Sequence, residues 1–387
     1  MVETLKIGML SWESMHSIQV GGLSKAVTGM AEGLAENGQD VHVFTRGYTE
    51  QLDREEIGGV DYHRCKFDHG NGVLDHSRKM CRAMEEAVRV EEERYGEFDI
   101  IHGHDWMVVD ALKGFDDRYK VMSFHSTESG RNGGRTLSGR TSEKISEKEW
   151  LGGYVSDRVV TVSDVMKKEL QKLYQIPPGK ISVVPNGTDT QSVDRGVDPG
   201  TVKERYGIHP LAPLLMFLGR MEYQKGPDIM VDSIPHILEH RDDSRIVMAG
   251  AGGMRNQVEE RAGQLGVSQS TDLLGYVREE EKLDLLKASD IVCMPSRNEP
   301  FGLVLFEAWA SKTAVVASNV GGLSENIDNL ENGIKTFPNP VSFAGGINHI
   351  IDNPDQIQEL GEKGQKKLKK FSWGRIGEKL LKVYSGS

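Results

Sequence analysis

The chain has 387 residues, which at roughly 100 to 200 residues per domain predicts two domains, each with its own hydrophobic core. Lys and Arg total 47 and Asp and Glu total 58, so the net charge of −11 argues against a nucleic-acid or anionic-membrane partner. The chain has three cysteines without a C-x-x-C motif and no signal-peptide pattern, which predicts a cytoplasmic protein. It has no apolar run of roughly eighteen residues, so we predict no integral membrane segment.

Strand-like and helix-like patterns alternate along the first half of the chain. Residues 5–10 form an apolar strand pattern, and residues 23–35 carry apolar side chains at helical spacing. Five further strands are predicted at residues 41–44, 99–102, 120–124, 159–162 and 181–184. This alternation predicts a parallel sheet with helices on both faces, a doubly wound α/β domain.

A second α/β series follows a polar connector at residues 188–200. Its predicted strands are residues 214–218, 245–249, 290–294 and 314–317. We therefore expect two doubly wound domains, residues 1–190 and 191–371. Ligands of such sheets bind beyond the carboxyl ends of the strands, so a cleft between the two domains is the expected site.

Two cations lie between a predicted strand and the next helix. Arg220 and Lys225 follow the strand at residues 214–218, and Pro227 suits the first position of a helix. Fixed positive charge beside free backbone N–H groups is what a diphosphate requires. The alternative is a pair of solvated surface cations. The turn at residues 250–253 lacks the spacing of a dinucleotide-binding motif and is interpreted as a turn only.

Two carboxylates flank a glycine in the segment Glu299-Pro300-Phe301-Gly302-Leu303-Val304-Leu305-Phe306-Glu307. Glu299 is expected in a loop and Glu307 in a helix, so the two can reach different parts of one extended ligand whose phosphates lie near the helix amides. The alternative is a helix with an acidic first turn.

The first strand ends before Gly21 and Gly22, where backbone can approach a phosphate closely, although a two-glycine turn alone is a weak signal. His102, His104 and His125 each lie at or near the end of a predicted strand. Their spacing is loose for a metal site, so a neutral polar cleft lining is expected instead. No D-x-D sequence is present to anchor a metal-bound sugar nucleotide, and we predict no metal ion.

In this order the motifs resemble retaining glycosyltransferases of the GT-B fold, in family 4 and the glycogen synthase group. The resemblance rests on Trp12-Glu13 with Gly21-Gly22-Leu23, His102-Gly103-His104-Asp105-Trp106, Pro185-Asn186-Gly187, Gly219-Arg220 with Lys225-Gly226, Glu299-Pro300-Phe301-Gly302 with Glu307, and Phe371-Ser372-Trp373. It implies two Rossmann-like domains facing across a central cleft. A last helix, at about residues 372–387, would return to the N-terminal, acceptor-side domain, and the C-terminal domain would bind the nucleotide sugar.

The resemblance also implies roles for individual residues. Arg220 and Lys225 would hold the diphosphate, and Glu307 the ribose. The donor sugar would meet Glu299, His125 near its C6 hydroxyl, and the backbone of Phe301, Gly302 and Leu303. The loop at Gly21 and Gly22 would close on phosphate and sugar.

Within the family, His125-Ser126-Thr127-Glu128 and the segment 145–150 are similar to α-glucan and maltooligosaccharide synthases. This implies a UDP- or ADP-sugar donor, with glucose as the sugar, an α-glucan or maltooligosaccharide acceptor, and no cofactor. Gln19 stands where starch and bacterial glycogen synthases carry a lysine, so that phosphate contact is either missing or supplied by another group. Two alternatives stay open: a family 4 enzyme with a lipid-linked or surface-glycan acceptor, and a non-catalytic sugar-nucleotide-binding protein.

Overall fold

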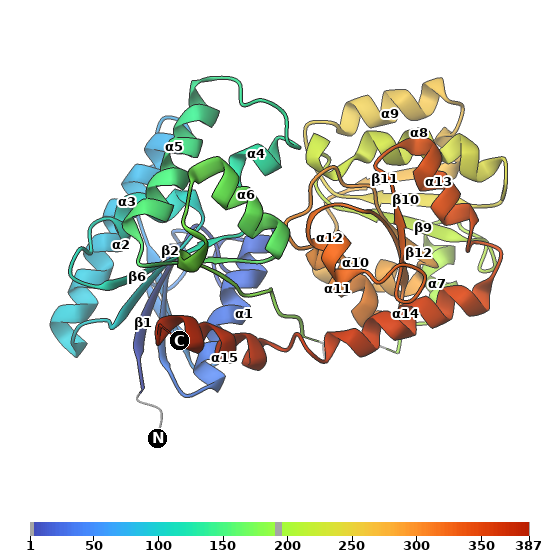
Figure 1. The fold of residues 1–387 in the computed structure, drawn as a ribbon. Helices are drawn as coiled ribbons and strands as arrows, with labels where there is room; N and C mark the ends of the chain where they lie inside the picture. The colour runs from blue at the N-terminus through green and yellow to red at the C-terminus, as the bar shows by residue number, and fades with distance from the viewer. Residues whose placement is uncertain (1–3, 190–195, 387) are drawn as a thin grey trace. The chain divides into compact units, whose positions relative to one another are not determined.

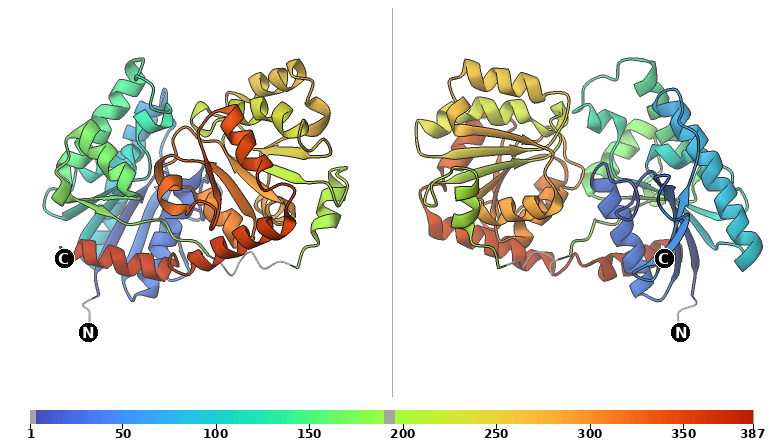
Figure 2. Two further views of the ribbon diagram at one scale, coloured as in Figure 1. Left: turned by 45° about the vertical axis from the view of Figure 1, so that its right-hand side comes forward. Right: turned by 180° about the vertical axis from the view of Figure 1, so that it is seen from behind.

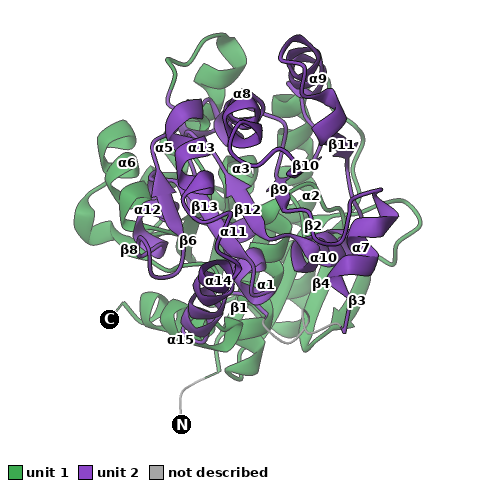
Figure 3. Cartoon of the chain, turned by 90° about the vertical axis from the view of Figure 1, so that its right-hand side faces the viewer, with its two compact units in different colours: residues 1–129, 135–187, 371–387 green, residues 130–134, 188–370 purple. Residues whose placement is uncertain are grey.

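The computed structural model describes residues 4–189 and 196–386, and the chain forms two units (Figures 1 and 3). Unit 1 contains residues 1–129, 135–187 and 371–387, and unit 2 contains residues 130–134 and 188–370. The domain boundary expected between residues 190 and 191 lies outside the described residues. The short segment 130–134, expected in the first domain, belongs to the second unit.

Unit 1 is built on an eight-stranded sheet with the order β3-β4-β2-β1-β5-β6-β7-β8. The strands are β1 (Lys6–Ser11), β2 (Asp40–Arg46), β3 (Arg54–Ile57), β4 (Val60–Cys65), β5 (Ile100–His104), β6 (Tyr119–Phe124), β7 (Arg158–Thr161) and β8 (Ile181–Val183). All neighbouring strands are parallel except β3, which pairs antiparallel with β4 at the sheet edge. The predicted parallel sheet is confirmed for the other strands, and β3 adds an antiparallel edge strand, in a hairpin with β4, that the sequence patterns did not predict.

Helices cover this sheet because each has an apolar face that must be buried. They are α1 (Gly22–Glu36), α2 (Val73–Tyr95), η1 (Trp106–Val108), α3 (Val109–Leu112), α5 (Arg140–Val155), α6 (Asp164–Tyr174), η2 (Pro178–Lys180) and α15 (Trp373–Tyr384). A short helix, α4 (Glu128–Arg131), spans the point where the chain passes between the units.

The last helix, α15, packs on α1 of unit 1. Two glycines of α1 allow the close approach: a Cβ on Gly29 would lie 2.0 Å from the Trp373 indole, and one on Gly33 would lie 2.2 Å from the Trp373 carbonyl oxygen. Ile376 and Leu380 of α15 are fully buried in the same apolar cluster as Ile7 of β1. The C-terminal segment is thus part of the hydrophobic core of unit 1.

Unit 2 is built on a six-stranded sheet, all parallel, with the order β11-β10-β9-β12-β13-β14. The strands are β9 (Leu214–Leu218), β10 (Arg245–Ala249), β11 (Thr271–Gly275), β12 (Ile291–Met294), β13 (Ala314–Ser318) and β14 (Ile334–Thr336). The central strands β9, β10, β12 and β13 are apolar and buried on both faces, as expected for a sheet with helices on each side.

Two groups of helices cover the sheet of unit 2, and Figure 2 shows helices on both of its faces. One group contains α8 (Pro227–Leu238), α9 (Arg255–Gln264) and α13 (Pro340–Asn348), and the other contains α7 (Pro199–Arg205), α10 (Glu279–Ala288), α11 (Leu303–Ala310) and α14 (Pro354–Leu368). Short elements at η3 (Tyr223–Lys225), η4 (Ser268–Ser270) and α12 (Gly321–Asn326) complete the unit. The doubly wound α/β architecture predicted for each half of the chain is confirmed.

Candidate functional site

The strand order of unit 2 reverses between β9 and β12. From β9 the chain adds β10 and β11 on one side and then β12, β13 and β14 on the other. In open α/β sheets such a switch point leaves a crevice at the carboxyl ends of the two central strands, because the connections leave in opposite directions. Arg220 and Lys225 follow β9, and Glu299 and residues 301–303 follow β12. The structure therefore brings these predicted residues to one edge of one sheet.

Backbone contacts hold the segment that carries Arg220. The Met221 N–H donates to the carbonyl of Ala251 over 2.8 Å, and a Cβ on Gly250 would lie only 1.8 Å from the Gly219 carbonyl oxygen. The Arg220 guanidinium is exposed and donates to Gln224 Oε1 over 3.0 Å. The turn at residues 250–253 was interpreted from sequence as a turn only, and it also supports the Arg220 backbone.

Lys225 and Glu299 form an ion pair, with 2.6 Å between Lys225 Nζ and Glu299 Oε2. The Lys225 side chain is 21% exposed and that of Glu299 only 6%, so the pair is largely withdrawn from water. Gly226, which follows Lys225, has a φ of 68°. A Cβ at this position would lie 2.2 Å from the Pro295 carbonyl oxygen, so glycine is needed for the backbone after Lys225 to lie this close to the end of β12. Lys225 is therefore not the solvated surface cation of the alternative interpretation.

The loop of Glu299 leads into the start of α11. Ser296 Oγ donates to Glu299 Oε2 over 3.3 Å, and the Glu299 carbonyl accepts from the Gly322 N–H over 2.7 Å. Gly302 precedes the helix at a φ of 98° and provides no side-chain cap to the first amides of α11. A helix start of this kind favours a negatively charged ligand group, because its amides carry partial positive charge.

Glu307 lies in the second turn of α11, and the first turn of this helix has no acidic residue. The alternative of an acidic first turn is therefore wrong. Glu307 Oε1 accepts from Lys282 Nζ of α10 over 2.8 Å, and Lys282 also contacts Glu279 over 2.8 Å. These bonds hold the Glu307 carboxylate in place on α11.

Unit 1 has its own switch point between β1 and β5. After β1, the Glu13 carboxylate accepts from the N–H groups of Val20 and Gly21, the latter over 3.0 Å. Glu13 is only 4% exposed, and burial raises the pKa of its carboxyl group against these two amide bonds. Sequence reasoning included Glu13 in a motif without giving it a role. The contact shows that Glu13 holds the loop leading to Gly21 and Gly22 at the start of α1.

His102 and His104 are fully buried, so the interpretation that they line a cleft is wrong. His102 bonds Tyr384 Oη and Ser123 Oγ, each over 2.7 Å. His104 Nδ1 lies 3.1 Å from His125 Nε2, and the backbone N–H of His125 donates to Asp105 Oδ1 over 2.8 Å. Burial lowers the pKa of His102 to about 3 and that of His125 to about 4, so both rings are neutral at neutral pH.

In the described residues, the side chains close enough together to share a metal ion are His42, His63 and Glu91 rather than the three histidines near β5 and β6. His42 Nδ1 and His63 Nε2 bond each other over 2.9 Å, and Glu91 is paired with Arg54 over 2.9 Å. These residues thus partner one another and an adjacent cation. None of them was predicted as part of the site.

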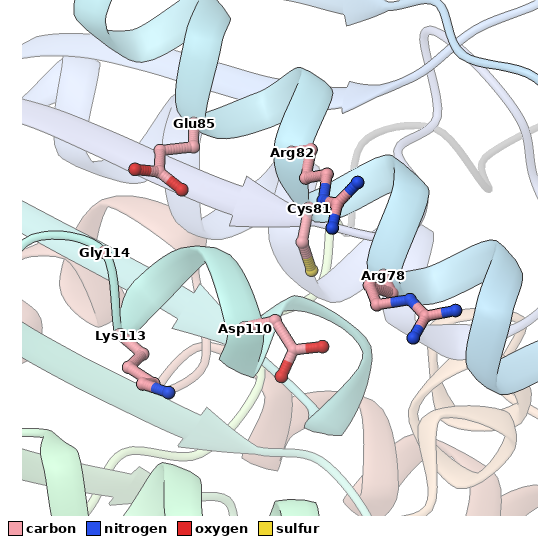
Figure 4. Close-up of a pocket in the computed structure, with 7 residues that line it drawn as sticks. All are labelled: Arg78, Cys81, Arg82, Glu85, Asp110, Lys113 and Gly114. Atoms are coloured by element: carbon pink, nitrogen blue, oxygen red, sulfur yellow. The ribbon is translucent and has the colours of Figure 1, made fainter.

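Two surface pockets lie on unit 1, away from the predicted residues. The first, of about 440 Å³, lies between α2 and α3 and is shown in Figure 4. The second, of about 550 Å³, shares Arg78 and Asp110 with it and extends to α5. Their linings mix both signs of charge, and Asp110 is already paired with Lys148. Neither pocket contains a predicted site residue, although Glu147 and Lys148 of the segment 145–150 line the second.

The fold and the residues at its switch points define a class of protein, a glycosyltransferase with two Rossmann-like domains of the GT-B type. The model of the family described as "Glycosyltransferase Family 4" matches residues 20–192, and that described as "Glycosyl transferases group 1" matches residues 201–367. The chain belongs to the family 4, glycogen synthase-like glycosyltransferases. Across the described ranges, no helix has both the length and the apolar character needed to cross a membrane.

Similar proteins include an uncharacterised glycosyltransferase of Methanocaldococcus jannaschii, 35% identical over 98% of this chain and 98% of that protein. A glycogen synthase of Mycobacterium tuberculosis is 30% identical, over 98% of this chain and 94% of that protein. A D-inositol 3-phosphate glycosyltransferase of Nocardia farcinica is 28% identical, over 95% and 85% respectively. These relatives establish the family and leave the donor and the acceptor of this chain undetermined.

Solved structures share the fold over nearly the whole chain. Sucrose-phosphate synthase from Thermosynechococcus elongatus has a TM-score of 0.82 at 21% identity, covering 98% of both chains. The catalytic domain of starch synthase IV from Arabidopsis thaliana, bound to ADP and acarbose, has a TM-score of 0.81 at 17% identity, covering 99% of both. Anabaena HepE, in complex with UDP and glucose, has a TM-score of 0.78 at 18% identity, covering 98% and 99%.

Proposed function

We propose that this chain transfers a glucosyl unit, with retention of anomeric configuration, from a nucleoside-diphosphate glucose to an α-glucan or maltooligosaccharide. The observation that carries the proposal is the Lys225–Glu299 pair at the β9/β12 switch point. It places a cation suited to phosphate beside a carboxylate suited to sugar hydroxyls, in a crevice of the type that binds nucleotides.

The diphosphate would be held by protein groups and not by a metal ion. Arg220, Lys225 and the amides at the start of α11 supply positive charge at one sheet edge of unit 2. As the glycosidic bond breaks, the bond electrons move to the diphosphate, and these groups stabilise the added charge. The same leaving oxygen accepts the proton of the acceptor hydroxyl, so a retaining reaction on one face of the sugar needs no carboxylate nucleophile.

In this proposal Glu299 and the neutral His125 each bind the donor sugar, and Glu307 binds the ribose. Gln19 offers no cation to the phosphates and donates through Nε2 to the Met15 carbonyl over 2.7 Å. Unit 1 would therefore meet the donor through the backbone near Gly21 and Gly22, the loop that Glu13 holds.

The choice of glucose and of a glucan acceptor draws on similar proteins. The relative from Mycobacterium tuberculosis is a glycogen synthase, and the starch synthase IV structure contains ADP and acarbose. The HepE structure contains UDP and glucose, so the proposed donor is a UDP- or ADP-glucose. We place the reaction in the cytoplasm, which agrees with the free, buried thiols of Cys65, Cys81 and Cys293.

The test is a panel of UDP-, ADP- and GDP-linked glucose, galactose and N-acetylglucosamine, with the released nucleoside diphosphate measured with and without maltooligosaccharides. We expect one glucose nucleotide to be used at least about tenfold better than its galactose counterpart, a difference of about 1.4 kcal/mol that one misplaced hydroxyl can produce. The product linkage, read by proton NMR, should be α.

Three results would contradict parts of the proposal. Equal use of the three sugars would remove the glucose assignment. Transfer to a lipid-linked or other glycan acceptor, with no stimulation by maltooligosaccharides, would show that the α-glucan acceptor is wrong. Donor binding without release of nucleoside diphosphate, even with acceptors present, would make the chain a sugar-nucleotide-binding protein.

A further inference from the structure

The rings of His104 and His125 leave two buried nitrogens without a partner in the described residues. His104 Nδ1 and His125 Nε2 bond each other over 3.1 Å. His104 Nε2 and His125 Nδ1 are buried and make no hydrogen bond. His104 itself has no exposed surface, whereas His125 retains partial exposure. Both unpartnered nitrogens are buried, and only His125 belongs to a residue that reaches the protein surface.

Proton counting allows two arrangements of this pair. Burial keeps both rings neutral, so each has one N–H and one bare nitrogen. If His125 Nε2 donates, the proton of His104 must lie on its Nε2, where it stays unsatisfied in the protein interior. If His104 Nδ1 donates, the proton of His125 lies on Nδ1, and His104 Nε2 is a bare nitrogen. Each arrangement leaves one ring N–H without a protein acceptor, at His104 Nε2 in the first and at His125 Nδ1 in the second. An unsatisfied buried N–H is costly, and the cost is smaller on His125, which reaches the surface, so the second arrangement is favoured, most strongly when a ligand accepts from His125.

Neighbouring groups do not rescue the first arrangement. His102 stacks on His104 with ring centroids 4.3 Å apart, but its nitrogens are already bonded to Tyr384 and Ser123. The stack holds the plane of the His104 ring without offering an acceptor for its Nε2.

We propose that His104 is a positioning residue that fixes the tautomer of His125, so that His125 Nδ1 carries a proton and donates it in a hydrogen bond to a hydroxyl oxygen of the donor sugar. The ligand part of this inference rests on the proposed function, since it takes the sugar of the nucleotide to lie against His125. The tautomer itself is a property of the free protein.

The first test reads the tautomer directly and needs no activity. Two-bond proton–nitrogen correlation spectra of the protein labelled with ¹⁵N-histidine distinguish N–H from bare ring nitrogens, and the signals are assigned with His104→Asn and His125→Ala variants. We expect N–H at Nδ1 in both rings at neutral pH. A proton on His125 Nε2 would overturn the proposal, whether or not the protein transfers sugar.

The second test uses the glucose nucleotide that the donor panel selects. His104→Phe fills the space without a donor, and His104→Asn retains an N–H near the position of Nδ1. We expect His104→Phe to lower kcat at least tenfold with donor KM within threefold, and His104→Asn to recover most of kcat. The proposal that His104 positions His125 would be overturned by a kcat within threefold of wild type for soluble His104→Phe. It would also be overturned if kcat fell equally in His104→Phe and His104→Asn.

His63→Phe is the matched control, because His42 Nδ1 and His63 Nε2 form the same kind of ring-to-ring bond over 2.9 Å. That pair lies on β2 and β4, separated from β5 in the sheet by β1. The kcat of His63→Phe should equal that of wild type. Absence of transfer by wild type with every donor would reject the proposed function while leaving the NMR result to decide the tautomer.

Discussion

Breaking the Lys225–Glu299 pair should destabilise unit 2 even without a ligand. Lys225→Met leaves Glu299, which is only 6% exposed, with the Ser296 hydroxyl at 3.3 Å as its remaining side-chain hydrogen-bond partner among the described residues. That hydroxyl is a weak replacement for an ammonium at 2.6 Å. The buried carboxylate then loses the charge that compensated its desolvation.

The expected size lies between two limits. Removing one partner of a fully buried pair costs about 3–5 kcal/mol, whereas exposed pairs contribute less than about 1 kcal/mol. Because the Lys225 side chain keeps 21% exposure, we expect about 2–3 kcal/mol for Lys225→Met. For a unit of this size that lowers the melting temperature by about 4–12 °C.

A double-mutant cycle separates the pair from other effects of each substitution. We follow the unfolding of three variants in urea and by calorimetry: Lys225→Met, Glu299→Gln and the double variant. The double variant should lose less unfolding free energy than the two single variants lose together, by at least about 1 kcal/mol. Lys363→Met is the control, since its pair with Glu359 is exposed on both sides and should contribute little to stability. Additivity within about 0.5 kcal/mol would show that the pair does not form in the free protein.

Three other predictions concern activity and acid stability. Arg220→Ala should slow transfer roughly 30- to 1000-fold, because it removes about 2–4 kcal/mol of stabilisation from the departing diphosphate. The rate is measured as release of nucleoside diphosphate, with the surface variant Arg241→Ala as the control. Activity of Arg220→Ala within threefold of wild type would exclude Arg220 from the site. Transfer should continue in EDTA because protein groups meet the phosphate charge; complete loss, restored by a divalent ion, would reveal a metal requirement. Burial lowers the pKa of His63 to about 3. Below about pH 6.5 the unfolded chain therefore binds a proton at this residue that the folded protein does not bind. As the pH falls, the free energy of unfolding should decrease by up to about 1.4 kcal/mol per pH unit because of this group. His63→Phe should flatten the acid side of the stability profile by that slope, and an unchanged slope in urea titrations at several pH values would contradict the buried neutral state.

Much of the fold could be predicted because its signals are local. Apolar strands followed by helical periodicity indicate doubly wound sheets, and residues that follow parallel strands must share a sheet edge. This is why Arg220, Lys225 and Glu299 could be grouped although Glu299 lies 74 positions beyond Lys225.

The sequence patterns missed four strands, β3, β4, β11 and β14, and the two shortest of them carry weak local signals. β3 is a short charged edge strand, Arg-Glu-Glu-Ile, with no buried residue, and β14 has only three residues. Their strand state comes from pairing with β4 and β13, which a single-sequence pattern does not contain. The short segment 130–134 was likewise assigned to the wrong unit, since its contacts lie with residues far along the chain.

The sequence by itself determined the two α/β units, their order and the residue types at the ends of β9 and β12, because backbone propensity and apolar periodicity act over a few residues. Only the tertiary structure decided which polar groups partner one another: Lys225 with Glu299, Glu13 with the amides of the loop before α1, and His104 with His125. A buried charge or ring nitrogen is stable only with a partner at hydrogen-bond distance, and packing of distant strands and loops sets that distance.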